Sequence, residues 1–131
     1  MKSIFNNSIR MTEKTLDFLW KRQGIIANNI ANQDTPNYKA KLLTFEESFR
    51  SQIEGVGRKK GPGTKKAFAE AIDRADANTK ENNSGSNRLD GNNVSPDAEY
   101  TELARTGLQY QYALRAINDE FMRIRSVIKG Q

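Results

Sequence analysis

Hydrophobic side chains recur every seven residues in the last third of the chain. One column contains Tyr100, Gly107, Leu114, Phe121 and Ile128, and the complementary column contains Leu103, Tyr110, Ile117 and Ile124. Eight of these nine positions are apolar, a pattern typical of a helix that packs along its whole length. Ser95 and Pro96 supply a helix start, and Gly130 supplies a stop. The sequence therefore predicts a helix over residues 96–129, within a C-terminal coiled-coil segment 96–131.

The first thirty residues carry a similar pattern. One column contains Phe5, Thr12, Leu19 and Ile26, the other contains Ile9, Leu16, Gln23 and Ile30, and a further apolar stripe contains Ile4, Met11, Phe18 and Ile25. This predicts a coiled-coil helix within residues 1–33. One partner helix covers only one such stripe, so apolar surface stays outward and marks an interaction site. The simpler alternative, in which the stripes are only the contacts of a helical hairpin, stays open.

The middle of the chain has a different composition. From residue 55 to residue 95 the only large apolar side chains are Val56, Phe68, Ile72, Leu89 and Val94. Residues 55–66 and 78–95 are rich in Gly, Asn, Ser and Lys, as mobile loops are, and residues 66–76 between them favour a short helix. We therefore expect segment 55–95 to be flexible, polar and without a core.

The predicted fold class is mainly α. Long N- and C-terminal helices pair as a coiled coil or helical hairpin, and the loop-rich middle joins them. Residues 34–54 are expected to form a turn, an extended segment and a short helix. We expect the pairing to involve Leu16, Leu19, Ile26 and Ile30 on the first helix and Leu103, Tyr110, Leu114, Ile117, Phe121 and Ile124 on the last.

Composition excludes most enzyme classes. The 131 residues include no cysteine and no histidine, which removes disulfides, thiol nucleophiles, zinc clusters and imidazole acid–base catalysis. We therefore predict a protein that is not an enzyme and has no cofactor, metal site or small-molecule substrate. The first fifteen residues hold no apolar signal region, and no apolar run approaches the roughly 20 residues that span a bilayer. These features predict a cytoplasmic protein that the Sec route does not export.

An asparagine-rich motif follows the N-terminal helix. Its central residues are Asn28, Asn29, Ile30, Ala31, Asn32, Thr35, Pro36, Tyr38 and Lys39. Asparagine is a poor residue inside a helix, so we expect these amides to bond backbone groups at the helix end or a neighbouring subunit. Thr35 precedes Pro36 and is pushed towards an extended conformation, which ends the helix before that point. Tyr38 and Lys39 then begin the extended segment.

This motif closely resembles the signature of the bacterial flagellar rod, hook and hook-filament junction proteins. Six of its positions are polar residues or a proline that helix packing alone does not require. Residues 88–94, together with later parts of the last helix, are similar to the proximal rod branch of that family. The absence of a large inserted domain between the terminal helices agrees with that branch.

The resemblance implies a structural role. Members of this family leave the cytoplasm unfolded through the flagellar type III export gate and assemble by helix pairing into the rod of the basal body, outside the inner membrane. Their partners are other rod proteins, further copies of the same chain, the inner-membrane ring and the export gate. Exposed apolar stripes gain partners in such a tubular wall, because each subunit touches several neighbours.

A basic coiled-coil protein that binds nucleic acid is the alternative. The net charge is +5, and Lys59, Lys60, Lys65 and Lys66 form a basic cluster that could meet phosphates. However, no aromatic side chain interleaves with these lysines to stack on bases. A solvated linker is the better interpretation of the cluster, and no specific nucleic acid is expected.

Overall fold

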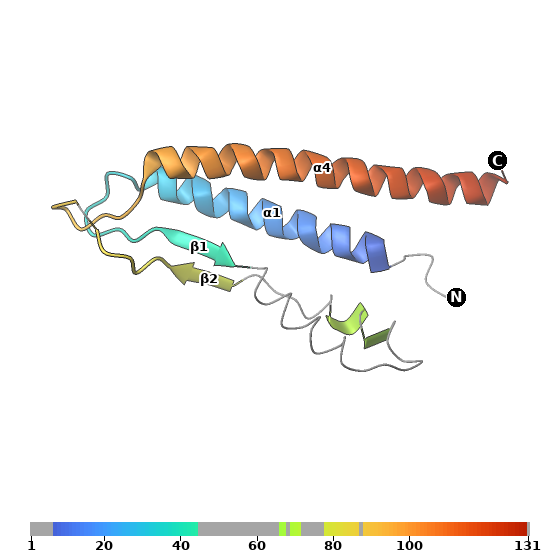
Figure 1. The fold of residues 1–131 in the computed structure, drawn as a ribbon, viewed down its shortest axis with the longest axis horizontal. Helices are drawn as coiled ribbons and strands as arrows, with labels where there is room; N and C mark the ends of the chain where they lie inside the picture. Colours follow the sequence, from blue (N-terminus) through green and yellow to red (C-terminus); the bar gives the residue numbers. More distant parts are fainter. Residues whose placement is uncertain (1–6, 45–65, 68, 72–77, 87, 131) are drawn as a thin grey trace.

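The computed structural model describes residues 7–44, 66–67, 69–71, 78–86 and 88–130. Its elements are α1 (Asn7–Ala31), β1 (Lys41–Thr44), β2 (Asn78–Glu81) and α4 (Pro96–Lys129). Helices α1 and α4 run antiparallel, and the two strands lie along α1 on the side away from α4 (Figure 1). The prediction of a mainly α fold with long terminal helices is confirmed.

The last helix begins and ends at the predicted residues. Ser95 has extended backbone angles and Pro96 occupies the first turn, although the Ser95 side chain makes no capping hydrogen bond. Asp97 and Glu99 lie in the first turn, where the helix dipole favours acidic groups. Gly130 adopts a left-handed conformation with φ of 71°, and its N–H bonds the carbonyl of Ser126. The resulting helix of 34 residues is about 50 Å long.

Polar contacts fix the register of the two helices near both ends of α1. At one end the Ser8 hydroxyl donates to Oε1 of Glu120 over 3.1 Å. At the other end the Asn29 side chain donates to Oε1 of Glu99, also over 3.1 Å. Between them Arg22 forms an ion pair with Glu102. These contacts define an antiparallel hairpin in which the C-terminal part of α4 continues past Ser8.

The core of the described residues is small. Its buried apolar side chains are Ile9, Leu19, Ile26, Ala40, Ala71 and Val94, of which the first three lie on α1. The heptad column of Leu103, Tyr110, Ile117 and Ile124 on α4 is only half-buried. Most of the large apolar surface of α4 is exposed, because α1 covers only one of its sides.

A short sheet was not predicted. Strands β1 and β2 pair antiparallel, with Lys41 opposite Glu81 and Leu43 opposite Thr79. The polar composition of residues 78–81 predicts a mobile loop, and all four residues are in fact exposed. Backbone pairing to β1, which itself packs on α1, makes this polar segment a strand. Val94, from the same supposedly coreless region, is buried.

Several predictions fall at least partly outside the described residues. These are the short helix expected before residue 54, the N-terminal heptad positions Ile4 and Phe5, and the basic cluster apart from Lys66. Within the short helix expected over 66–76, residues 66–67 and 69–71 are helical. No described helix is long and apolar enough to cross a membrane.

A mutation at Thr106 tests the packing of α4. This residue is fully buried, and its hydroxyl has no hydrogen-bond partner among the described residues. Thr106→Val keeps the shape of the side chain and removes the unpaired hydroxyl. The free energy of unfolding should therefore rise by about 1 kcal/mol in urea denaturation. The matched control is Thr101→Val, which removes an exposed hydroxyl that bonds the Asp97 carbonyl. A Thr106→Val variant less stable than wild type would contradict this packing.

Candidate functional site: an asparagine-lined joint

The predicted motif lies where α1, β1 and the start of α4 meet. We call this region the joint, defined as residues 28–41 and 88–94 together with Glu99. Helix α1 ends at Ala31, before Thr35 and Pro36 as predicted. After a turn, the chain reverses along α1 and enters β1 (Figure 1). Residues 88–94 close over that turn before α4 begins.

Asn29 connects three elements through one side chain. It is almost fully buried, at 1% exposure. Its Oδ1 accepts the N–H of Lys41 over 2.9 Å, and its Nδ2 donates to the Lys41 carbonyl over 2.8 Å and to Glu99 over 3.1 Å. The Tyr38 hydroxyl donates to the same Oδ1 over 3.2 Å. Both donor hydrogens and both acceptor positions of the amide are therefore used.

Asn28 and Asn32 hold the end of α1 and the turn after it. The Tyr38 hydroxyl donates to Oδ1 of Asn28 over 2.9 Å. The Asn32 amide donates to the Asn28 carbonyl over 2.8 Å, and the Thr35 hydroxyl donates to Oδ1 of Asn32 over 3.2 Å. The motif amides thus bond groups of their own chain, and several of those groups are backbone atoms, which was one of the two expected possibilities.

Asn92 closes the joint from the other side. It is fully buried, and its Nδ2 donates to the carbonyls of Asn32, Gln33 and Thr35 over 2.9, 3.1 and 2.8 Å. Its Oδ1 accepts the N–H of Val94 over 2.7 Å. Three carbonyls of the turn after α1 therefore gain a partner from a residue about sixty positions away. Each of these carbonyls also accepts a second donor, from the Thr35 N–H, Nη1 of Arg88 and the Tyr38 N–H respectively.

Asn93 and Lys39 make further hydrogen bonds within the joint. The Ala40 N–H donates to Oδ1 of Asn93 over 2.7 Å, and the Asn93 amide donates to the Asn82 carbonyl over 2.6 Å. Nζ of Lys39 donates to the Gly91 carbonyl over 2.7 Å. These bonds connect residues 91–93 to Lys39 and Ala40, which lead into β1.

The contributions of residues 88–94 and of Glu99 to the joint were not predicted. The composition of residues 78–95 predicts a mobile loop around Asn92 and Asn93. The one available signal was that residues 88–94 resemble the same protein family as the motif. Local composition hides the role of these residues, because an asparagine that bonds a distant carbonyl looks the same in sequence as one in a solvated loop.

Burial shifts two titrating groups at the joint. Burial raises the pKa of Glu99, and the nearby Glu102 adds to this effect, while the hydrogen bond from Asn29 opposes it. The pKa of Tyr38 is raised by burial and by the charges of Glu99 and Glu81. The Tyr38 hydroxyl thus stays protonated and able to donate to Asn28 and Asn29.

The joint has the features of a structural element, with buried amides that are bonded to backbone and to each other. Among the described residues, no group of three or more acidic side chains could hold a metal ion. Apart from Ile30, the predicted interface residues lie outside the joint, along α1 and α4. Leu19 and Ile26 are buried there, Leu16 and Ile30 are half-buried, and Leu114 and Phe121 are exposed.

Comparison with known proteins identifies the family. The family model described as flagella basal body rod protein matches residues 18–39, which include the whole asparagine-rich motif. The chain is 34% identical to the flagellar basal body rod protein FlgB of Bacillus subtilis (strain 168), over 98% of both chains. The chain belongs to the FlgB family of flagellar basal body rod proteins.

Two other FlgB proteins extend the match. The protein of Aquifex aeolicus (strain VF5) is 30% identical, and that of Escherichia coli (strain K12) is 28% identical, each over 94% of both chains. The similarity to FlgB therefore spans α1, the joint and α4 together. The resemblance to the flagellar rod and hook proteins, predicted from the motif, is confirmed.

Asn92 provides a test of the joint. Asn92→Ala removes the hydrogen bonds of a fully buried amide to three carbonyls and to the Val94 N–H, and should lower the free energy of unfolding by about 2–3 kcal/mol. Asn83→Ala, at an exposed position of the same loop, is the matched control and should stay within about 0.5 kcal/mol of wild type. Urea denaturation followed by circular dichroism measures both. Equal losses for the two variants would argue against the capping role.

The raised pKa of Glu99 predicts that the free energy of unfolding depends on pH. Its pKa in the folded protein lies above the ordinary value, so the folded state binds the proton more tightly than the unfolded state does. The free energy of unfolding should therefore fall as pH rises from the ordinary pKa through the raised one. Glu99→Gln keeps an acceptor for Asn29 and removes this charge.

Urea denaturation at several pH values between about 4 and 8 measures the effect. Glu99→Gln should be at least as stable as wild type at neutral pH and should show a flatter pH dependence. Asp97→Asn removes an exposed carboxylate from the same helical turn and serves as the control. A Glu99→Gln variant that is less stable at neutral pH and keeps the full slope would show that burial does not control this group.

Proposed function

We propose that this protein is a structural subunit of the proximal rod in the flagellar basal body, and that it assembles by pairing its long helices with those of its neighbours. The observation that carries the proposal is the similarity to FlgB over nearly the whole chain, including both helices and the joint. On this proposal the protein acts mechanically, as part of the motor driveshaft, and motility requires it.

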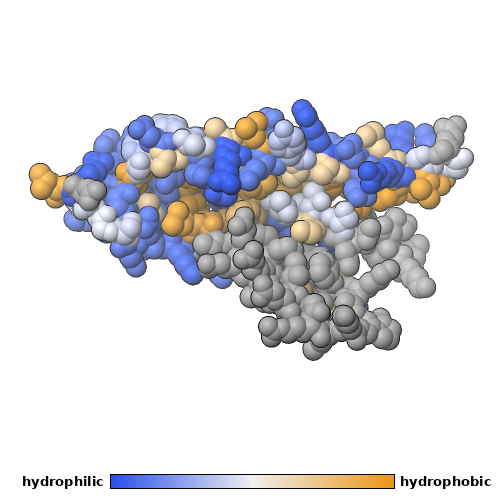
Figure 2. All heavy atoms as spheres, in the orientation of Figure 1, coloured by the Kyte–Doolittle hydropathy of each residue, from blue (hydrophilic) through white to orange (hydrophobic). Residues whose placement is uncertain are grey.

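The exposed side of α4 supports assembly through helix pairing. The heptad column of Leu103, Tyr110, Ile117 and Ile124 is half-buried against α1. In the other column, Leu114 is 39% exposed and Phe121 is 46% exposed. Exposed apolar side chains along one flank of a helix are typical of an interaction surface, since helices of neighbouring subunits would bury them. Figure 2 shows apolar side chains along the body of the hairpin on the viewed face.

The proposed route to the rod is export in an unfolded state by the flagellar type III system. The protein would be cytoplasmic before export and would lie outside the inner membrane afterwards. Its proposed partners are other rod proteins, further copies of itself, the inner-membrane ring and the export gate. The lack of cysteine fits a chain that ends in a more oxidising compartment, because no wrong disulfide can form there.

The nucleic-acid alternative has weaker support. Its basic cluster lies outside the described residues except for Lys66. Helix α4 mixes acidic and basic side chains and does not present one basic face. Membership of the FlgB family favours the rod over this alternative.

Leu114 tests the proposal directly. Leu114→Asp places a charge on the exposed flank of α4, where the isolated subunit can solvate it but a helix–helix interface cannot. The variant should melt like wild type when purified, yet be absent from basal bodies and leave cells non-motile. Motility assays and immunoblots of purified basal bodies measure these outcomes.

The matched control is Leu114→Met, which keeps an apolar side chain of similar volume and should assemble normally. Ile117→Asp should also abolish incorporation, but it lies nearer α1 and is expected to destabilise the subunit as well. Normal motility and normal basal-body content in Leu114→Asp cells would contradict assembly through this flank of α4.

A further inference from the structure

The last turns of α4 extend beyond the start of α1. In the described part of the chain, α1 begins at Asn7, and the Ser8 hydroxyl contacts Glu120 of α4. Helix α4 then continues for nine residues, about 13 Å, to its end at Lys129. Figure 1 shows this end of α4 projecting past α1. The described part of α1 is therefore too short to cover it.

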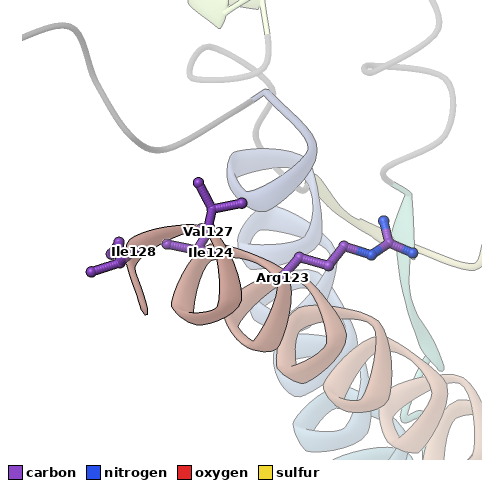
Figure 3. Close-up of a pocket in the computed structure, with 4 residues that line it drawn as sticks. All are labelled: Arg123, Ile124, Val127 and Ile128. Atoms are coloured by element: carbon purple, nitrogen blue, oxygen red, sulfur yellow. The ribbon is translucent and has the colours of Figure 1, made fainter. Parts of the chain in front are cut away.

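This continuation carries an apolar pocket. Among the described residues, Arg123, Ile124, Val127 and Ile128 line it, and we call it the C-terminal pocket. In Figure 3, Val127 and Ile128 project from the last turns of α4, and the Arg123 guanidinium points away from Ile128. Val127 is 81% exposed and Ile128 is 73% exposed. Nη1 of Arg123 already lies 3.8 Å from Oε1 of Glu120, so an occupant needs apolar side chains rather than a carboxylate.

The register of the hairpin indicates which part of the chain lies opposite the pocket. The Ser8–Glu120 and Asn29–Glu99 contacts are 21 residues apart on α1 and also 21 residues apart on α4. The two helices therefore keep one antiparallel register over three heptads. Extended by one more turn, this register places the fourth residue before Ser8 opposite the fourth residue after Glu120.

The residues that this register brings to the pocket are apolar. They are Ile4 and Phe5, which lie outside the described residues, and they fall opposite Ile124. On a helix that continues α1, Ile4 and Phe5 share the face of Ser8, because residues three and four apart are neighbours on a helix. Helical side chains also lean towards the N-terminus of their own helix, which here is the direction of the end of α4.

Covalent attachment favours this segment over a separate molecule as the occupant. Four helical residues span about 6 Å, so Ile4 lies as far beyond Ser8 as Ile124 lies beyond Glu120. A group tethered at so short a distance has an effective concentration in the mM range or above. The pocket can therefore fill from its own chain before a separate molecule binds.

We propose that Ile4 and Phe5 of the same chain fill the C-terminal pocket, so that the pairing of the terminal helices extends past Ser8 to the last turns of α4. This inference goes beyond the proposed rod function and does not depend on it, because it assigns the pocket to a contact within one subunit. The exposed flank that holds Leu114 and Phe121 then remains for neighbouring subunits.

Cysteine cross-linking tests this contact in a chain that has no cysteine of its own. The full-length double variant Ile4→Cys/Ile124→Cys is purified, oxidised in dilute solution and run on a non-reducing gel. If Ile4 lies in the pocket, the two cysteines come within disulfide distance and a compact, cross-linked monomer forms.

The matched control is Ile4→Cys/Met122→Cys. Met122 is 62% exposed and lies on the same part of α4, but it does not line the pocket. The Ile124 pair should form the cross-linked monomer about fivefold faster or more than this control. More dimer than cross-linked monomer, equal rates at positions 122 and 124, or no cross-link would each overturn the proposal.

A second measurement leaves the pocket residues unchanged. Phe5→Asp places a charge against the pocket, whereas Asn6→Asp places the same charge about 160° around the helix from Ser8. Amide hydrogen exchange in residues 124–129 should be about threefold faster or more in Phe5→Asp and close to wild type in Asn6→Asp. Equal exchange in the two variants would contradict the contact. Both experiments use the isolated subunit, so their failure would leave the rod function standing.

Discussion

The side-chain amide of Asn29 is the interaction on which the arrangement of the molecule most depends. It lies near the end of α1, bonds both backbone groups of Lys41 as a neighbouring strand would, and reaches Glu99 in the first turn of α4. One buried group therefore sets the position of β1 and of α4 relative to α1. Aspartate would offer no donors here, and an aliphatic residue would leave buried backbone groups unpaired. Only an amide of this length satisfies all four partners.

Asn92 makes the joint rigid by bonding the turn after α1 from the other side. With both asparagines in place, the polar loop end of the hairpin is fixed by side-chain hydrogen bonds in a region with little apolar core. Along α4, by contrast, much of the apolar surface is open to solvent. In such a subunit the joint is held by hydrogen bonds, whereas apolar side chains of α4 remain exposed. This combination is typical of a protein that buries such a surface in an assembly.

The sequence predicted the elements that depend on local patterns. Heptad spacing located both helices, the pair Ser95 and Pro96 gave the start of α4, and Gly130 gave its end. The sheet and the joint contacts of Asn92 and Asn93 could not be predicted in this way. Residues 78–81 are polar and exposed, so they show no alternation, and they form a strand only because β1 lies beside them. Likewise, one heptad column of α4 is half-buried and the other is more exposed, because α1 packs against only one side of α4.

The sequence by itself determined that the chain has two long amphipathic helices, an asparagine-rich helix end and the signature of the flagellar rod and hook proteins, because periodicity, caps and motifs are written in neighbouring residues. Only the tertiary structure decided which asparagines are buried and which flank of α4 is exposed. The physical reason is that burial and hydrogen bonding depend on residues distant in sequence. Asn29 and Glu99 are seventy positions apart, and Asn92 and Asn32 are sixty apart.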